Sequence, residues 1–450
     1  MANNAITPGD AAEAASVALA RVAAQYEALP YPTRDPAEED KRLIGTWLDD
    51  LDLINHRCFY GVRKFDAGFR ILVAGGGTGD GTIFLAQQLR ERGITNARVV
   101  HLDVSQAAID VAKARAARRG LSGIEFVKSS LLDMPALGLG TFDYVNCVGV
   151  LHHLPSPEAG LQALMPSLAE DGAMALLLYA RVGRLGIYQA QALLRQLLLL
   201  APELAPLDVC KQMLAKLPKT NWLARSAELH PDLHFGGDAA LYDLLLHAQD
   251  RAYDIPEIYA WFRDQAGLHP YFSDVHRGRL PYQPTQWLSE PHWQSALSNV
   301  SREQSEQMAE QLGGDLVVHA FFATRTHDPH APYGDADYVP FFLREAHPAS
   351  GVSLVEVIDS HRGQAFLLTH TQSGLRRVMH PTPAIRAILQ GIDGERTWRE
   401  IFSFARANLQ KTHASVASDL MSDNLLFSEF EPWYLTLNSI ERLLLRKLIA

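Results

Sequence analysis

The sequence predicts an α/β fold built on a mostly parallel, seven-stranded sheet. From residue 70 to residue 180, short apolar runs alternate with amphipathic helical stretches, a pattern typical of right-handed crossovers between parallel strands. Residues 71–81 read ILVAGGGTGDG, an apolar strand that leads directly into a glycine-rich turn. The run VVHLDVS then places Asp103 at the end of the next strand. Together these features indicate a Rossmann-like sheet with a nucleotide-type cofactor at its first crossover.

The glycine-rich turn and the aspartate have complementary properties. Gly75, Gly77 and Gly79 can adopt backbone angles that a side chain forbids, so the main chain can approach a ligand closely. Asp103 follows Gly77 by 26 residues, where a carboxylate at a strand end can accept two hydrogen bonds from a ribose diol. A tight strand-to-helix connection without a ligand is the alternative, and the presence of Asp103 argues against it.

The residue that begins the following helix separates two kinds of cofactor. A dinucleotide places its pyrophosphate at a helix N-terminus, and Asp80 at that position would repel the phosphates. S-adenosylmethionine instead presents an ammonium and a sulfonium, which tolerate a neighbouring carboxylate. The charge pattern therefore favours S-adenosylmethionine, with a dehydrogenase-type dinucleotide enzyme as a weaker alternative.

Four successive strand ends of the chain resemble those of the class I Rossmann-like S-adenosylmethionine-dependent methyltransferases. The stretches that carry this resemblance are ILVAGGGTG, HLDVSQAAIDVAKARA, IEFVKSSLLDMP and FDYVNCVGVLHHL. The resemblance implies that the three glycines face the methionine part of the cofactor and Asp103 its ribose. It also implies that Ser130 and Leu131 face the adenine. The ammonium is then bound by a backbone oxygen of Val148 or Gly149.

Two residues depart from the pattern of that family. Val73 stands where the family usually has an acidic residue, and Ser130 stands where it usually has an aspartate. Each change removes about one hydrogen bond, roughly 0.5–1.5 kcal/mol, and leaves the backbone cradle intact. We therefore expect cofactor binding to survive, while a non-catalytic cofactor- or partner-binding module on the same fold remains the alternative.

Methyl transfer from a sulfonium is an in-line displacement and needs no covalent nucleophile on the protein. A general base helps when the acceptor is protonated, which makes His152 and His153 after the fourth strand candidates. Tyr31 is a third catalytic candidate, and Tyr26 a candidate cofactor contact, because an N-terminal arm of this kind often covers the cofactor in related methyltransferases. The alternatives are that the histidine doublet shapes the turn and that the tyrosines anchor the arm.

A length of 450 residues predicts several domains. The expected segments are an N-terminal helical arm at 1–35, a first core part at 36–182, a helical cap insertion at 183–249, a closing core part at 250–326 and a small α+β appendage at 337–450. Within the appendage, VSLVEVIDS and GQAFLLTH are expected strands. Packing or dimerisation is the favoured role of the appendage, so a homodimer is left open.

Composition narrows the partners to a small-molecule or protein substrate. A net charge of -10 without a basic run argues against nucleic acid. The three cysteines have no metal-ligand spacing, so we expect no metal site, and their odd number fits no disulfide framework, so we expect a reducing cytoplasm. No signal peptide and no membrane span are expected, since the most apolar stretch, at 193–202, is too short to cross a bilayer. The acidic run PAEED at 36–40 is expected to be a solvated face.

Overall fold

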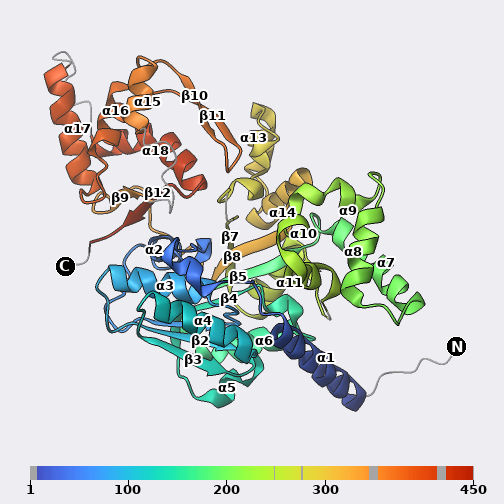
Figure 1. Ribbon diagram of the computed structural model, residues 1–450. Helices are drawn as coiled ribbons and strands as arrows, with labels where there is room; N and C mark the ends of the chain where they lie inside the picture. The colour runs from blue at the N-terminus through green and yellow to red at the C-terminus, as the bar shows by residue number, and fades with distance from the viewer. Residues whose placement is uncertain (1–7, 248, 275–276, 344–352, 413–421, 449–450) are drawn as a thin grey trace. The chain divides into compact units, whose positions relative to one another are not determined.

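The computed structural model describes residues 8–247, 249–274, 277–343, 353–412 and 422–448. The chain divides into two compact units, each assembled from three separate segments. The first unit contains Met1–Asp49, Phe65–Phe272 and Trp287–Thr326, and the second contains Asp50–Lys64, Ser273–Gln286 and His327–Ala450. Figure 1 labels the helices and strands of both units.

The first unit is built on an eight-stranded sheet. Its main path has the order β3-β2-β1-β4-β5-β8-β7, and β6 pairs with β5 off this path. The strands are β1 (Arg70–Ala74), β2 (Arg98–Asp103), β3 (Ile124–Lys128), β4 (Phe142–Val148), β5 (Leu168–Ala180), β6 (Ala252–Tyr253), β7 (His269–Phe272) and β8 (Val318–Thr324). Along the path from β3 through β2, β1 and β4 to β5, all neighbouring strands are parallel, whereas β8 is antiparallel to both β5 and β7. The seven strands of the main path confirm the predicted Rossmann-like fold class.

Helices follow the strands of this sheet as crossovers. These helices are α3 (Asp80–Glu91), α4 (Gln106–Arg118), α5 (Met134–Leu137), α6 (Pro157–Leu164), α12 (Ile255–Ile258) and α14 (Arg302–Gly313), with α13 (Pro291–Leu297) between the last two. Helix α3 packs against α4, and α6 packs against α5. The N-terminal helix α1 (Pro8–Ala28) also contacts α4. The arm predicted at the N-terminus therefore begins with a helix that lies on the sheet's own helical layer.

A helical segment follows β5 before the chain returns to the sheet. Its helices are α7 (Leu185–Leu200), α8 (Pro206–Lys216), α9 (Trp222–Arg225), α10 (Asp232–Phe235), α11 (Gly237–Leu241) and the π-helical turn η7 (Tyr242–Leu246). They share a small apolar core that includes Ile187, Leu194 and Cys210. These helices form the green group in Figure 1. They occupy the segment expected to be a helical cap insertion.

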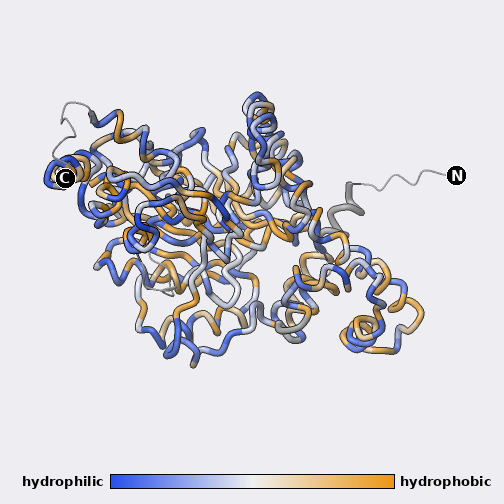
Figure 2. The backbone as a smooth tube through the Cα atoms, turned by 90° about the horizontal axis from the view of Figure 1, so that it is seen from above, coloured by the Kyte–Doolittle hydropathy of each residue, from blue (hydrophilic) through white to orange (hydrophobic). Residues whose placement is uncertain are grey.

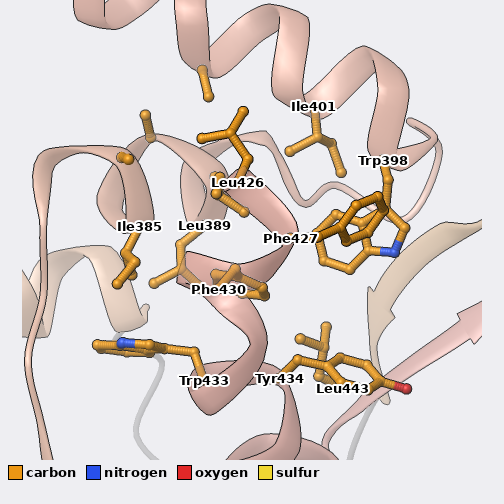
Figure 3. Close-up of a cluster of buried hydrophobic side chains, with 14 of the residues drawn as sticks. Ile385, Leu389, Trp398, Ile401, Leu426, Phe427, Phe430, Trp433, Tyr434 and Leu443 are labelled. Atoms are coloured by element: carbon orange, nitrogen blue, oxygen red, sulfur yellow. The ribbon is translucent and has the colours of Figure 1, made fainter. Parts of the chain in front are cut away.

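The second unit combines helices with two small antiparallel sheets. Strand β12 (Leu443–Arg446) pairs with β9 (Val339–Phe342), and β10 (Phe366–His370) pairs with β11 (Leu375–Met379). Its helices are α2 (Leu51–Cys58), α15 (Leu354–Ser360), α16 (Pro383–Gly391), α17 (Trp398–Thr412) and α18 (Asp423–Ser439). Figure 3 shows aromatic side chains from α17 and α18 meeting around Trp398, whose ring lies 5.6 Å from that of Phe430. This unit has a hydrophobic core of its own.

The structure differs from the sequence expectations in three places. Residues 273–286, expected in the closing core part, belong to the second unit. Residues 50–64, expected in the first core part, belong to the second unit because α2 packs against β12: Leu445 N donates to His56 Nδ1 at 2.9 Å. VSLVEVIDS was expected to be a strand, but the structure has helix α15 there. Ser353 and Glu356 form a capping box at its start, a local signal that outweighs the β-branched composition.

The hydropathy of the chain varies as expected for helices and strands that are packed on one face. Figure 2 shows hydrophobic and hydrophilic stretches alternating along the chain, as expected when each element has one buried and one exposed face. None of the described helices combines the length and hydropathy needed to cross a membrane.

Candidate functional site

The glycine-rich turn connects β1 to α3. Gly75, Gly77 and Gly79 have φ values of 77°, 53° and 99°, in the left-handed region that favours glycine. Helix α3 then begins at Asp80. The turn therefore has the backbone conformation that the sequence predicted for a ligand cradle.

Asp103 ends β2 and lies directly beside this turn. Its Oδ2 accepts a hydrogen bond from Gly77 N at 2.7 Å, and its Oδ1 accepts one from Ser105 N at 2.9 Å. Burial raises the pKa of the Asp103 carboxyl, although these backbone hydrogen bonds oppose the rise. Each carboxylate oxygen can accept a second hydrogen bond. Asp103 thus stabilises the turn and can still bind a diol.

The other cofactor candidates lie at the ends of β3 and β4, which the sheet order places on either side of the β2–β1 pair. Ser130 accepts a hydrogen bond from Leu132 N at 3.2 Å and caps a short 3-10 turn, and Leu131 is buried. Gly149 follows Val148 with a φ of 77°, and within the described part of the chain no atom beyond its two sequence neighbours lies within 4 Å of the position that a Cβ would take there. The sheet thus brings all the predicted cofactor residues from these strand ends to one edge.

Asp80 is the centre of an ionic network that the sequence did not indicate. Arg34 Nη2 lies 2.6 Å from Asp80 Oδ2, and Arg115 Nη1 lies 2.7 Å from Asp80 Oδ1. Although burial acts in the opposite direction, the hydrogen bond and charge of Arg34, with help from Arg115, hold the pKa of Asp80 below its ordinary value. Because two cations neutralise Asp80, its repulsion of a pyrophosphate is weaker than the sequence argument assumed.

The same network corrects the expectation for the acidic run at 36–40. Glu39 is 6% exposed and accepts a hydrogen bond from Arg115 Nε at 2.7 Å, with Arg119 bound to its other oxygen. A glutamate with two arginine partners can be buried, since its charge is compensated. Glu39 is therefore part of the packing beneath α4 and not of a solvated face.

The N-terminal arm lies against the glycine-rich turn after leaving α1. Thr78 Oγ1 donates to the Pro32 carbonyl oxygen at 2.7 Å, and Thr78 N donates to the Tyr31 carbonyl oxygen at 3.4 Å. A Cβ at Gly77 would lie 2.6 Å from that Tyr31 oxygen. Glycine is thus required at position 77 for the arm to approach this closely.

The histidine doublet follows β4, and its two members have different surroundings. His153 Nδ1 donates to the Gln249 carbonyl oxygen at 3.0 Å, and its ring stacks on His247 with centroids 3.8 Å apart. His152 is fully buried, and its ring lies 3.9 Å from that of Tyr179. The hydrogen bond and the stacking therefore fix the orientation of the His153 ring, whereas His152 packs in the core.

Two residues that the sequence analysis did not single out complete the surroundings of His153. Asp243 lies on the π-helical turn η7 and accepts hydrogen bonds from Tyr26 at 2.9 Å and from Tyr179 at 3.1 Å. His247 follows that turn, and its Nε2 lies 3.2 Å from the Tyr26 hydroxyl. No local motif marks Asp243 or His247, because their partners lie far away in the sequence.

His153, Asp243 and His247 also lie close enough together to be considered as metal ligands, with ligand atoms within 4.8 Å of one another. His247 Nδ1, however, accepts the N–H of Gln249 at 3.0 Å. A neutral ring then has its proton on Nε2, so neither nitrogen of His247 has a free lone pair. The arrangement favours a hydrogen-bonded chain over a metal site.

A further buried carboxylate lies beneath the start of α3. Asp49 accepts hydrogen bonds from Thr46 Oγ1 at 2.6 Å and from Asn146 Nδ2 at 2.7 Å. A Cβ at Gly81 would lie 2.8 Å from Asp49 Oδ2. Burial raises the pKa of Asp49 to about 6, against the effect of the two hydrogen bonds. No motif in the sequence predicts this buried carboxylate.

Residues 72–174, which contain the glycine-rich turn, Asp103 and the histidine doublet, match a family model described as a methyltransferase domain. Residues 72–174 of this chain form a methyltransferase domain. For these residues, the match confirms the methyltransferase family predicted from the sequence.

Curated relatives match parts of the chain. An uncharacterized protein of Synechococcus sp. is 31% identical over 275 residues, which cover 60% of this chain and 63% of the relative. A ubiquinone biosynthesis O-methyltransferase of Vibrio parahaemolyticus is 31% identical over 132 residues, which cover 27% of this chain and 54% of the relative. The chain thus spans less than two thirds of the length of these relatives.

One solved structure resembles most of the chain. PKMT2 from Rickettsia typhi superposes with a TM-score of 0.58, covering 89% of this chain and 76% of that chain, and is 15% identical. PKMT2 has also been solved in complex with AdoHcy, with a TM-score of 0.58 and 14% identity. At this identity the similarity supports the fold.

Proposed function

We propose that the protein transfers the methyl group of S-adenosylmethionine to a small-molecule or protein acceptor by in-line displacement. The observation that carries this proposal is the convergence of the glycine-rich turn, Asp103 and His153 at the carboxyl ends of β1, β2 and β4, which are neighbours in the sheet. Ligands of open α/β sheets bind at these ends. A donor and an acceptor bound there would meet between the turn and His153.

The residues present fit the donor. The main chain at Gly75, Gly77 and Gly79 has the left-handed angles of a close cradle, and Gly149 leaves open space beside the end of β4. Asp103 would accept the ribose hydroxyls with its remaining lone pairs. When bound, S-adenosylmethionine supplies an electrophilic methyl group. The protein's contribution is to align the acceptor with that group and to exclude water.

His153 is the residue best placed to receive a proton from the acceptor. Burial lowers its pKa to about 4, although the hydrogen bond to Gln249 opposes this effect. The ring is therefore neutral at pH 7. Because Nδ1 donates to Gln249, Nε2 keeps its lone pair. Nε2 can thus orient an acceptor O–H or N–H and take its proton during transfer.

The two other catalytic candidates have different roles in this proposal. Burial raises the pKa of Tyr31, so its hydroxyl stays protonated at neutral pH and can act only as a hydrogen-bond donor or acceptor. His152 packs against Tyr179 and supports the turn after β4. We assign neither residue the part of general base.

The test of this proposal has two steps. Calorimetry with S-adenosylhomocysteine measures donor-site binding, and incubation with radiolabelled S-adenosylmethionine and a lysate fractionated by size shows whether label enters proteins or metabolites. The proposal predicts binding in the first step and protein-dependent labelling in the second. His153→Gln should bind S-adenosylhomocysteine normally and label poorly.

A non-catalytic binding module is the second candidate. Val73 and Ser130 favour it, because Val73 is buried in β1 and the Ser130 side chain caps its own turn. Capture of a partner without affinity for S-adenosylhomocysteine would support this alternative. Displacement of a bound ligand by NAD would instead support a dinucleotide enzyme.

We also propose the compartment, the acceptor class and the oligomeric state of the protein. The three cysteines are buried and unpaired, which supports a reducing compartment such as the cytoplasm. The net charge of -10 supports an acceptor other than nucleic acid. We propose that the second unit forms a homodimer contact, and sedimentation analysis would test this proposal.

A further inference from the structure

A directed chain of hydrogen bonds joins the cap to the N-terminal arm. Gln249 N–H donates to His247 Nδ1 at 3.0 Å. Burial lowers the pKa of His247 to about 3, so the ring is neutral and its single proton lies on Nε2. That proton is donated to the Tyr26 hydroxyl at 3.2 Å, and Tyr26 in turn donates to Asp243 at 2.9 Å. Each donor in this series of three hydrogen bonds has one acceptor, and this arrangement defines the tautomer of His247.

His153 is coupled to this chain through the same backbone unit. The carbonyl of Gln249 accepts from His153 Nδ1, while the N–H of Gln249 donates to His247 Nδ1. The two imidazole rings are stacked with an interplanar angle of 30°. A rotation of the His247 ring would disturb both the stack and Gln249. The orientation of His153 Nε2 therefore depends on the hydrogen bond that holds His247.

The arm that carries Tyr26 also contacts the cofactor side of the sheet. Ser105, two residues after Asp103, has its Oγ 3.1 Å from the Tyr26 carbonyl oxygen and 3.0 Å from Glu27 Oε2, so these two acceptors share its one hydroxyl proton. Further along the arm, the Tyr31 carbonyl oxygen faces Gly77. One short segment thus lies against the ribose aspartate, the glycine-rich turn and the acceptor-side histidines.

We propose that Tyr26 is a positioning residue that couples closure of the arm over the donor site to the orientation of His153. The proposal rests on the methyltransferase activity proposed above. With the arm in place, the Tyr26 hydroxyl holds the His247 Nε2 proton, and the stacked His153 presents Nε2 as a free acceptor. Without the Tyr26 hydroxyl, His247 Nδ1 still accepts the N–H of Gln249, but the Nε2 proton loses the acceptor that Tyr26 provides. The ring is then held by a hydrogen bond at one nitrogen only and can turn.

Nuclear magnetic resonance on protein labelled with ¹⁵N in histidine tests this assignment in the full chain. Long-range ¹H–¹⁵N spectra distinguish Nδ1–H from Nε2–H rings, and His247→Gln and His153→Gln identify the two signals. We expect an Nε2–H tautomer for His247 and an Nδ1–H tautomer for His153 in the presence of S-adenosylhomocysteine. In Tyr26→Phe, the His247 Nε2 proton should exchange faster with water because its hydrogen bond is lost, and the signals of the stacked His153 ring should shift with it.

Matched variants separate this effect from a general loss of structure. Tyr242→Phe removes a hydroxyl from the residue next to Asp243 that takes no part in the chain, and it should leave both tautomers unchanged. Asp243→Asn should weaken the Tyr26 bond and shift His247 in the same direction as Tyr26→Phe. Amide spectra and thermal unfolding of each variant report whether it is folded.

Specific results would overturn the proposal. An Nδ1–H tautomer for His247 in the unaltered protein contradicts the hydrogen-bond assignment. His153 signals in folded Tyr26→Phe that are identical to those of the unaltered protein contradict the coupling. Stoichiometric uptake of Zn²⁺ that is lost in Asp243→Asn would replace the chain with a metal site. Failure to bind S-adenosylhomocysteine with both tautomers as expected would instead refute the proposed function and leave the hydrogen-bond assignment standing.

Discussion

Replacing Asp103 with alanine removes the carboxylate that joins the glycine-rich turn to the second strand. In the structure this group accepts the N–H of Gly77 at 2.7 Å and that of Ser105 at 2.9 Å. Its remaining lone pairs are the ones we assign to the ribose hydroxyls. The substitution should therefore weaken donor binding directly, and it should also loosen the turn.

The size of the effect follows from the two ribose hydrogen bonds. A hydrogen bond to a charged group contributes about 1.5–3 kcal/mol, and the lower figure applies because each Asp103 oxygen already accepts a backbone N–H. Loss of two such bonds amounts to about 3 kcal/mol, which weakens binding roughly 150-fold at about 1.4 kcal/mol per factor of ten.

Calorimetric titration with S-adenosylhomocysteine measures this change. Asp110→Ala is the matched control, because Asp110 lies on α4 and its exposed side chain accepts a hydrogen bond from Gln106 at 2.8 Å. We expect the control to bind within about twofold of the unaltered protein, since an exposed surface substitution changes energies by only about 0.5 kcal/mol. If folded Asp103→Ala also binds with unchanged affinity, the ribose assignment is refuted.

Three other predictions concern the arm, the base and the buried carboxylate. Gly77→Ala places a Cβ 2.6 Å from the Tyr31 oxygen and should displace the arm. The displacement should appear as faster proteolysis of the arm and weaker S-adenosylhomocysteine binding. Gly68→Ala is the control, since Gly68 has a φ of 84° and open space around it among the described residues, and it should change neither proteolysis nor binding. Because the pKa of His153 is lowered to about 4 by burial, labelling rates should stay level from pH 8 down to pH 5, and a fall by half near pH 6.5 would contradict a neutral buried base. The pKa of Asp49 rises from 3.8 to about 6 on folding, so its contribution to stability is complete below pH 3.8 and is lost as the pH rises through 6, a difference of about 3 kcal/mol for a shift of about two units. Asp49→Asn should therefore be more stable than the unaltered protein to urea at pH 8 and similar at pH 4, and an equal difference at both pH values would argue against the shift.

The sequence by itself determined the fold class and predicted the proposed donor side of the site. Both depend on local patterns: an apolar strand that enters a glycine-rich turn, and an aspartate at the end of the next strand. Such patterns are read within about thirty residues, the length of one strand–helix–strand unit. They survive in the structure because neighbouring parallel strands bring their carboxyl ends to one edge, so Asp103 and Gly77 meet without help from the rest of the chain.

The surroundings of His153, the proposed base, were decided only by the tertiary structure. Tyr26 and Asp243 are 217 residues apart in the chain, and neither lies in a motif that predicts the other. The same holds for Glu39 with Arg115, and for residues 50–64, which pack on a strand near the C-terminus. A buried polar group needs a partner but does not specify which one, since any donor or acceptor of suitable geometry satisfies it. The packing of whole helices and strands determines which partner it meets, and the local sequence does not predict that packing.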